Sequence, residues 1–111
     1  MRNRNWLVED NLVALYLALY GDGGLPLDQR EIHLLIGHRG FPMRVQQYVA
    51  IHTNGKAGLP AGLRSPLFRE LYRIGSQMER SRFRNLVRLI LDVKQKIRKD
   101  KESGDTRSKT A

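Results

Sequence analysis

The sequence predicts an all-α protein, with a three-helix helix-turn-helix core at residues 1–62, a basic helical extension at 63–98 and a disordered tail at 99–111. Three observations lead to this fold class. Apolar residues recur three and four positions apart in several segments, which is the spacing of one helix face. Stretches rich in glycine and proline separate these segments. No segment gives a clear strand signal.

The first helix is expected over residues 6–20. Its buried face carries apolar residues at helical spacing, namely Leu12, Leu15, Tyr16 and Leu19. Asn5 is the expected N-cap, and Glu9 and Asp10 fall in the first turn, where the helix dipole favours negative charge. The glycine-rich stretch 21–24 ends the helix, because glycine adopts the left-handed conformation without strain.

A second, shorter helix is expected from about residue 28 to residue 36. Asp28 is its expected N-cap, and Glu31 stands three residues later, as in a capping box. The buried face consists of Ile32, Leu35 and Ile36. Gly37 then ends the helix.

A tight link at residues 38–41 leads into a third helix over 42–52. Pro42 suits the first position of a helix, because its missing N–H would have no partner there. Val45 and Tyr48 are interpreted as core contacts and Met43 as a residue at the edge of the core. The residues that follow, 54–60, have the composition of a turn and a loop.

The rest of the chain is expected to be helical from residue 65 to about 98. Ser65 and Pro66 suit an N-cap and a first helical position, and Gly75-Ser76 is expected to break or kink the helix. Apolar stripes flank this point, with Leu67, Phe68, Leu71 and Tyr72 before it and Phe83, Leu86, Val87, Ile90, Val93 and Ile97 after it. From Lys99 on, the only apolar residue is Ala111, so the tail is expected to be disordered.

The chain is strongly basic, with 20 Lys and Arg against 11 Asp and Glu in 111 residues and a formal net charge of +9. Such an excess favours a polyanionic partner, above all double-stranded DNA. Most of it lies in residues 64–101, which hold twelve basic and four acidic residues. Arg80, Arg84 and Arg88 recur there every four residues, so they are expected to form a ridge that follows a phosphate backbone. A solvated helix face is the alternative.

Residues 28–52 have the layout of a helix-turn-helix, in which the second helix lies in the major groove. We expect Arg44, Gln46 and Gln47 to be exposed on that helix, since Arg pairs with guanine and Gln with adenine through two hydrogen bonds. His38 and Arg39 in the turn are expected to contact phosphates. The predicted nucleic-acid-binding residues are His38, Arg39, Arg44, Gln46, Gln47, Lys56, Arg80, Arg84 and Arg88. An ordinary antiparallel helix pair is the alternative interpretation.

Two sets of residues carry a resemblance to known DNA-binding families. The opening Trp6-Leu-Val-Glu9-Asp10 resembles the start of Myb/SANT-like and homeodomain-like three-helix domains. The runs Ile-His-Leu-Leu-Ile-Gly-His-Arg (32–39), Met-Arg-Val-Gln (43–46) and Gly-Lys-Ala-Gly-Leu-Pro-Ala-Gly (55–62) resemble the helical region in front of HNH-type restriction endonuclease domains. That family has a polar turn where this chain has residues 39–41, and no His-Asn-His cluster follows. The resemblance therefore implies DNA recognition without cutting.

Several other chemistries find no support in the sequence. The chain has no Cys, which excludes disulfides, thiolate catalysis and cysteine zinc sites. His33, His38 and His52 match no common metal spacing, and the glycines at 21–24 lack the context of a phosphate loop. We therefore expect no metal, no cofactor and no enzymatic activity. The run 12–20 is short for a signal-peptide core and no segment reaches the roughly 20 apolar residues of a membrane span. A cytoplasmic location is therefore expected, in association with the nucleoid if the chain is bound to DNA.

The sequence thus favours a DNA-binding helix-turn-helix protein, either a transcriptional regulator or a DNA-targeting module of a restriction- or mobile-element-related system. Two alternatives stay open, a helical protein–protein adaptor and an RNA-binding protein. Few exposed aromatic residues are expected for base stacking, which counts against recognition of single strands. The apolar stripe of the C-terminal helix is long enough to pack against a second copy, so a homodimer is a further expectation.

Overall fold

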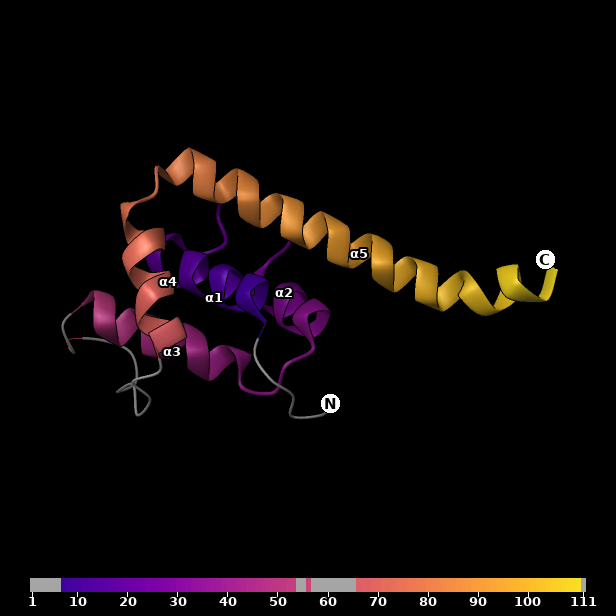
Figure 1. The fold of residues 1–111 in the computed structure, drawn as a ribbon, viewed down its shortest axis with the longest axis horizontal. Coiled ribbons are helices and arrows are strands. Elements are labelled where there is room, and N and C mark those ends of the chain that lie inside the picture. Colours follow the sequence, from indigo (N-terminus) through magenta and orange to yellow (C-terminus); the bar gives the residue numbers. More distant parts are fainter. Residues whose placement is uncertain (1–6, 54–55, 57–65, 111) are drawn as a thin grey trace.

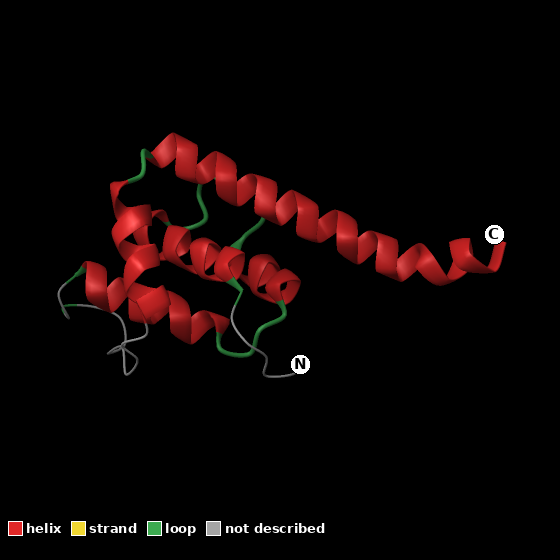
Figure 2. Cartoon of the chain, viewed as in Figure 1, coloured by secondary structure: helices red, strands yellow, loops and turns green. Residues whose placement is uncertain are grey.

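The computed structural model describes residues 7–53, 56 and 66–110, with side chains described as far as Lys101. This part of the chain forms five α-helices: Val8–Tyr20 (α1), Gln29–Ile36 (α2), Phe41–His52 (α3), Pro66–Gln77 (α4) and Arg80–Thr110 (α5). Among the described residues there is no strand (Figure 2), which confirms the predicted all-α class. None of the helices described is both long and apolar enough to cross a membrane.

The central element of the fold is α1. Helices α3, α4 and α5 all pack against it, and α2 contacts both α3 and α5 (Figure 1). Every residue from Asp10 to Leu17 except Leu12 is buried, because neighbours enclose α1 on most sides. Each helix contributes to the core, which consists of Val13, Ala14, Leu15, Tyr16, Leu17, Ile32, Ile36, Phe41, Val45, Tyr48, Phe68, Phe83, Val87 and Leu91.

The ends of α2 agree with the sequence prediction. Asp28 Oδ1 accepts a hydrogen bond from the Glu31 N–H at 2.8 Å, and Glu31 Oε1 accepts one from the Asp28 N–H at 3.0 Å. These two bonds form the predicted capping box. Gly37 ends the helix in the left-handed conformation, with φ of 74°. Local sequence signals therefore define this short helix completely.

The start of α1 differs from the prediction. Its N-cap is Leu7, whose side chain makes no capping bond, and Asn5 lies outside the described residues. Asn11 Nδ2 donates instead to the Leu7 carbonyl oxygen at 3.1 Å. The predicted end is confirmed, because Gly21 terminates α1 with a positive φ of 70°.

The break between α4 and α5 lies later than predicted. Gly75 is inside α4, which ends at Gln77, while the predicted N-cap Ser65 lies outside the described residues. Gly75 permits close packing: a Cβ atom there would lie 2.4 Å from Leu15 Cδ2 and 3.2 Å from Phe83 Cε2. Glycine is thus needed where α1, α4 and α5 meet.

This contact makes Gly75 a sensitive position. We expect Gly75→Ala to lower the free energy of unfolding by about 1–3 kcal/mol, since the added methyl group must displace a core side chain. The sign is opposite to the gain of ~1 kcal/mol that Ala normally brings over Gly in a helix. Denaturant unfolding measures the change, and the exposed neighbour Ser76→Ala is the matched control. Equal stability of both variants would contradict the close contact at Gly75.

Helix α5 continues beyond the core that packs against its first half (Figure 1). Its backbone is helical to Thr110, where the sequence predicts a disordered tail from residue 99. Extending an existing helix costs little once its first turn has formed, so the backbone continues as a helix although the tail contains Asp, Ser, Thr and Gly, which are weak helix formers. Leu91 is the last fully buried side chain among those described.

Candidate nucleic-acid interface

Helix α3 turns its predicted base-reading arginine inward. Arg44 is only 7 % exposed, and its Nη1 donates to Asn11 Oδ1 at 3.2 Å. Its guanidinium carbon lies 5.1 Å from the centre of the Phe68 ring. The prediction that Arg44 is exposed for the major groove is therefore wrong. The reason is the width of the buried face of α3, since Arg44 lies on the same side as the core residues Phe41 and Tyr48.

A polar network inside the core surrounds Arg44. Asn11 Oδ1 also accepts a hydrogen bond from the Tyr48 hydroxyl at 3.2 Å, and the Tyr48 ring stacks on Phe68 with 4.3 Å between ring centres. Burial disfavours the charged form of each group, so it lowers the pKa of Arg44 and raises the pKa of Tyr48 to about 12. The network ties α1, α3 and α4 together and supports the fold.

His38, in the turn before α3, is buried as well, with 5 % of its surface exposed. Its Nδ1 accepts a hydrogen bond from the Gly40 N–H at 3.0 Å. The expectation that His38 contacts phosphates is therefore wrong, because its ring faces inward and stabilises the turn. The next residue, Arg39, is exposed, and its contact with phosphates stays a prediction.

The outer side of α3 lines a hollow together with α2. This hollow has a volume of about 320 Å³ and is lined by Gln29, Arg30, His33, Phe41, Pro42, Val45 and Gln46. Gln46 is exposed as predicted, whereas Gln47 is half-buried. No acidic residue is among the lining residues, so the amides of Gln29 and Gln46, the Arg30 guanidinium and the His33 imidazole are its polar groups. Sequence reasoning missed Arg30, because only the packing of α2 beside α3 brings it close to Gln46.

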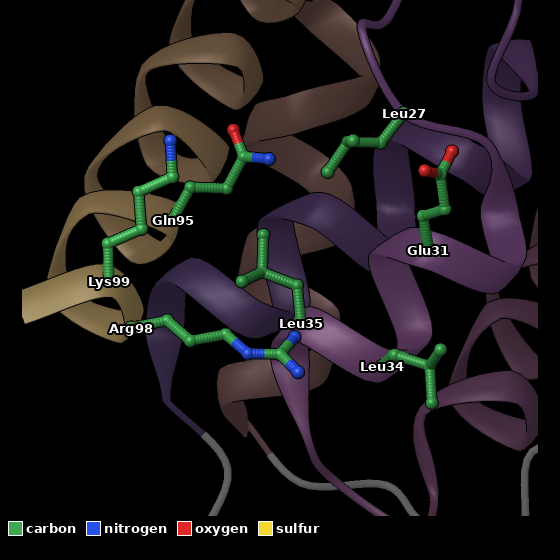
Figure 3. A pocket seen from close by; sticks show the side chains of 7 residues that line it. All are labelled: Leu27, Glu31, Leu34, Leu35, Gln95, Arg98 and Lys99. Carbon is green, nitrogen blue, oxygen red and sulfur yellow. The ribbon is translucent and has the colours of Figure 1, made fainter. Parts of the chain in front are cut away.

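A second hollow, of about 330 Å³, lies between α2 and α5. Its lining residues are Leu27, Glu31, Leu34, Leu35, Gln95, Arg98 and Lys99 (Figure 3). The α5 side provides the basic groups and Gln95, α2 provides the acidic group of Glu31, and the Arg98 side chain extends toward α2 (Figure 3). Arg98 and Lys99 belong to the basic residues of segment 64–101, but the sequence analysis does not predict them as site residues. A sequence does not show which part of a long helix lies beside α2.

A third hollow, of about 470 Å³, continues along α5. It is lined by Pro26, Asn85, Arg88, Leu89, Asp92 and Gln95, so Gln95 takes part in both hollows on this helix. Arg88 is exposed, as the ridge prediction requires. One side of α5 therefore carries Arg88, Gln95 and Lys99 on successive stretches of the helix.

The predicted ridge of Arg80, Arg84 and Arg88 is only partly exposed. Arg80 is exposed, with its guanidinium carbon 4.8 Å from the centre of the Tyr20 ring. Arg84 is half-buried beside Gly24, and its Nε is buried without a hydrogen-bond partner among the described residues. The expectation of a fully exposed ridge is thus wrong at Arg84, because the loop after α1 packs on this side of α5.

The remaining predicted residue, Lys56, is exposed beyond the end of α3, and its N–H donates to the Thr53 carbonyl oxygen at 3.2 Å. Within the described part of the chain, no three His, Asp or Glu residues come close enough to hold a metal ion. Comparison of the chain with protein-family models, curated proteins and solved structures finds no match. The charge, exposure and packing of the residues described above are therefore the basis for a functional proposal.

Proposed function

We propose that this chain binds double-stranded DNA, as a transcriptional regulator or a DNA-targeting module. The proposed contact surface, the α2 face, comprises Arg30, Gln46, Arg88, Gln95, Arg98 and Lys99. The observation that carries the proposal is the gathering of these basic and amide groups in two hollows that α2 helps to line and in a third hollow along α5. Glu31 and Asp92 are the only acids that line the three hollows. A surface of this kind suits a polyanion.

In this proposal the cations of the α2 face hold phosphates. A helix rises about 1.5 Å per residue, which separates Arg88 and Lys99 by about 16 Å along α5 and lets them reach different phosphates of one groove. Gln46 is the exposed α3 side chain suited to bond a base edge. Because Arg44 is buried, phosphate contacts provide most of the affinity, and binding should weaken steeply with salt.

The resemblance of the sequence to the helical region in front of HNH endonuclease domains supports the same function. It concerns DNA recognition and not cleavage. Its three runs cover part of α2 with the turn after it, part of α3 and residues that follow α3. One residue of the α2 face, Gln46, falls within these runs.

Substituting single cations of the α2 face tests the proposal. We expect Arg30→Gln and Arg88→Gln each to weaken binding to any duplex, because each removes one phosphate contact. Each should also reduce the slope of log affinity against log salt by about 1. Fluorescence anisotropy with a labelled duplex over a salt series measures both quantities.

Arg73→Gln is the matched control for these variants. Arg73 is an exposed arginine of α4, paired with Glu70 at 2.7 Å and absent from the lining of the three hollows. It should leave the affinity and the salt slope unchanged. Equal losses from Arg73→Gln and Arg30→Gln would mean nonspecific attraction by net charge, and tighter binding to hairpin RNA than to duplex DNA at one salt concentration would favour the RNA alternative.

A further inference from the structure

We propose that the outer side of α5 reads the base sequence of double-stranded DNA in the major groove. The contact residues are Asn85, Leu89 and Asp92, which we call the α5 reading line. All three line the hollow of about 470 Å³ along α5, and none belongs to the α2 face. The inference rests on the DNA binding proposed above and deepens it, because it adds side chains that select a sequence to cations that hold phosphates.

The α5 reading line points away from the core. A helix turns about 100° per residue, so Asn85 lies about 160° around α5 from each of the buried residues Phe83 and Val87. The members follow one another at intervals of four and three residues, which keeps them on one side of the helix. All three are exposed. This side can therefore enter the major groove, which is wide enough to admit an α-helix.

Each member of the line has a side chain suited to a base edge. The Asn85 amide can bond adenine through two hydrogen bonds, and the Asp92 carboxylate can accept one from the amino group of cytosine. An apolar side chain can contact the methyl group of thymine. Leu89 is 59 % exposed, so burial in this chain's own core does not account for its apolar side chain. Together the three groups recognise bases by hydrogen bonding and by shape.

Asp92 is the member that phosphate binding alone does not explain, because a carboxylate on a basic surface repels phosphates. Glu31, the other acid that lines the three hollows, accepts a hydrogen bond from the Asp28 N–H and so has a structural role. Asp92 pairs with Lys96 at 3.2 Å, but both side chains are largely exposed and such a pair adds little stability. An acid that weakens general attraction to DNA is useful where it favours one base over the others.

Two arginines flank the reading line. Arg82 and Arg88 are exposed and lie about 60° to either side of Asn85 around α5. When Asn85 faces the base edges, the two arginines face the phosphates on opposite walls of the groove. The only aromatic residue of α5, Phe83, is buried, so this helix lacks a stacking platform for the bases of a single strand. This arrangement therefore suits duplex DNA.

Selection of preferred sites from a pool of random DNA duplexes tests the inference on the full chain. Asn85 and Asp92 are about 10 Å apart along the helix, so the sites should contain an A·T and a C·G pair roughly two to three base pairs apart. Asp92→Asn should change the preferred C·G pair to A·T, because an asparagine amide pairs with adenine. Asn85→Ala should lower discrimination at the other position by about tenfold.

Glu70→Gln and Gln77→Ala are the matched controls, because they remove an acid and an amide at exposed positions of α4, outside the three hollows. Both should select the wild-type site, and circular dichroism should show all four variants folded, since every substituted residue is exposed. If the wild type binds duplexes without sequence preference, or if Asp92→Asn and Asn85→Ala select the wild-type site, the reading line is overturned and DNA binding stands. Failure of the wild type to bind any duplex at low salt would overturn both.

Discussion

Lys94→Met is expected to destabilise the protein by about 3–5 kcal/mol, the largest single effect that the structure indicates. The Asp10 side chain in α1 is completely buried, and Lys94 Nζ lies 2.9 Å from its Oδ1. Only 17 % of the Lys94 side chain is exposed, so water screens this ion pair weakly. Removing the ammonium group would take away the cation that lies 2.9 Å from this buried carboxylate, and urea unfolding would measure the loss of stability.

Lys96→Met is the matched control, because Lys96 pairs on the same helix with Asp92 at 3.2 Å but both side chains are largely exposed. This substitution should change stability little. The double variant Asp10→Leu/Lys94→Met should recover most of the stability that Lys94→Met loses, since it removes both buried charges together. Equal stability of Lys94→Met and Lys96→Met would show that the Asp10 carboxylate does not depend on Lys94.

The same ion pair shows where prediction from sequence stops. Asp10 is in the first turn of α1, as predicted, where the helix dipole favours its charge. Its burial against Lys94 could not be predicted, because the two residues are far apart in the sequence and meet only after α5 packs on α1. The position of Asp10 in the first turn of a helix explains why a carboxylate is favourable there. Only the tertiary fold shows that Lys94 is the cation beside it.

The helices themselves were largely predictable because their signals are local. Asp28 and Glu31 define the start of α2, and Gly21 and Gly37 define two helix ends. Gly75 is the exception, since sequence suggested a helix break where the structure has a close contact among three helices. A glycine has the same local signature in both cases, and the difference lies in neighbours that are distant in sequence.

The candidate site was less predictable than the fold. Gln46 and Arg88 are exposed as predicted, whereas His38 and Arg44 are buried. Periodicity indicates the direction of a buried helix face but not its width, which depends on how many elements cover the helix. On α3 the added cover is α4, whose Phe68 lies over the Arg44 guanidinium.

Substitution of Arg44 is therefore expected to have the second largest effect on stability. It also distinguishes a structural role of this arginine from a role in DNA recognition. We expect Arg44→Ala to lower the free energy of unfolding by about 2–4 kcal/mol. The substitution removes a charged hydrogen bond to Asn11 and a buried cation–π contact with Phe68. Arg44→Met should cost less, since it keeps most of the buried volume. Under conditions where the variants remain folded, their affinity for duplex DNA should equal that of the wild type.

Gln46→Ala should give the opposite pattern. Gln46 is exposed on the outer side of α3, so its removal should leave the unfolding free energy unchanged and reduce the preference for one duplex sequence over another. Stability and sequence preference, measured on both variants, thus distinguish two roles within the same helix. If Arg44→Ala keeps its stability and loses sequence preference, the arginine must leave the core to reach DNA, and the buried network with Asn11 would not be the DNA-bound arrangement.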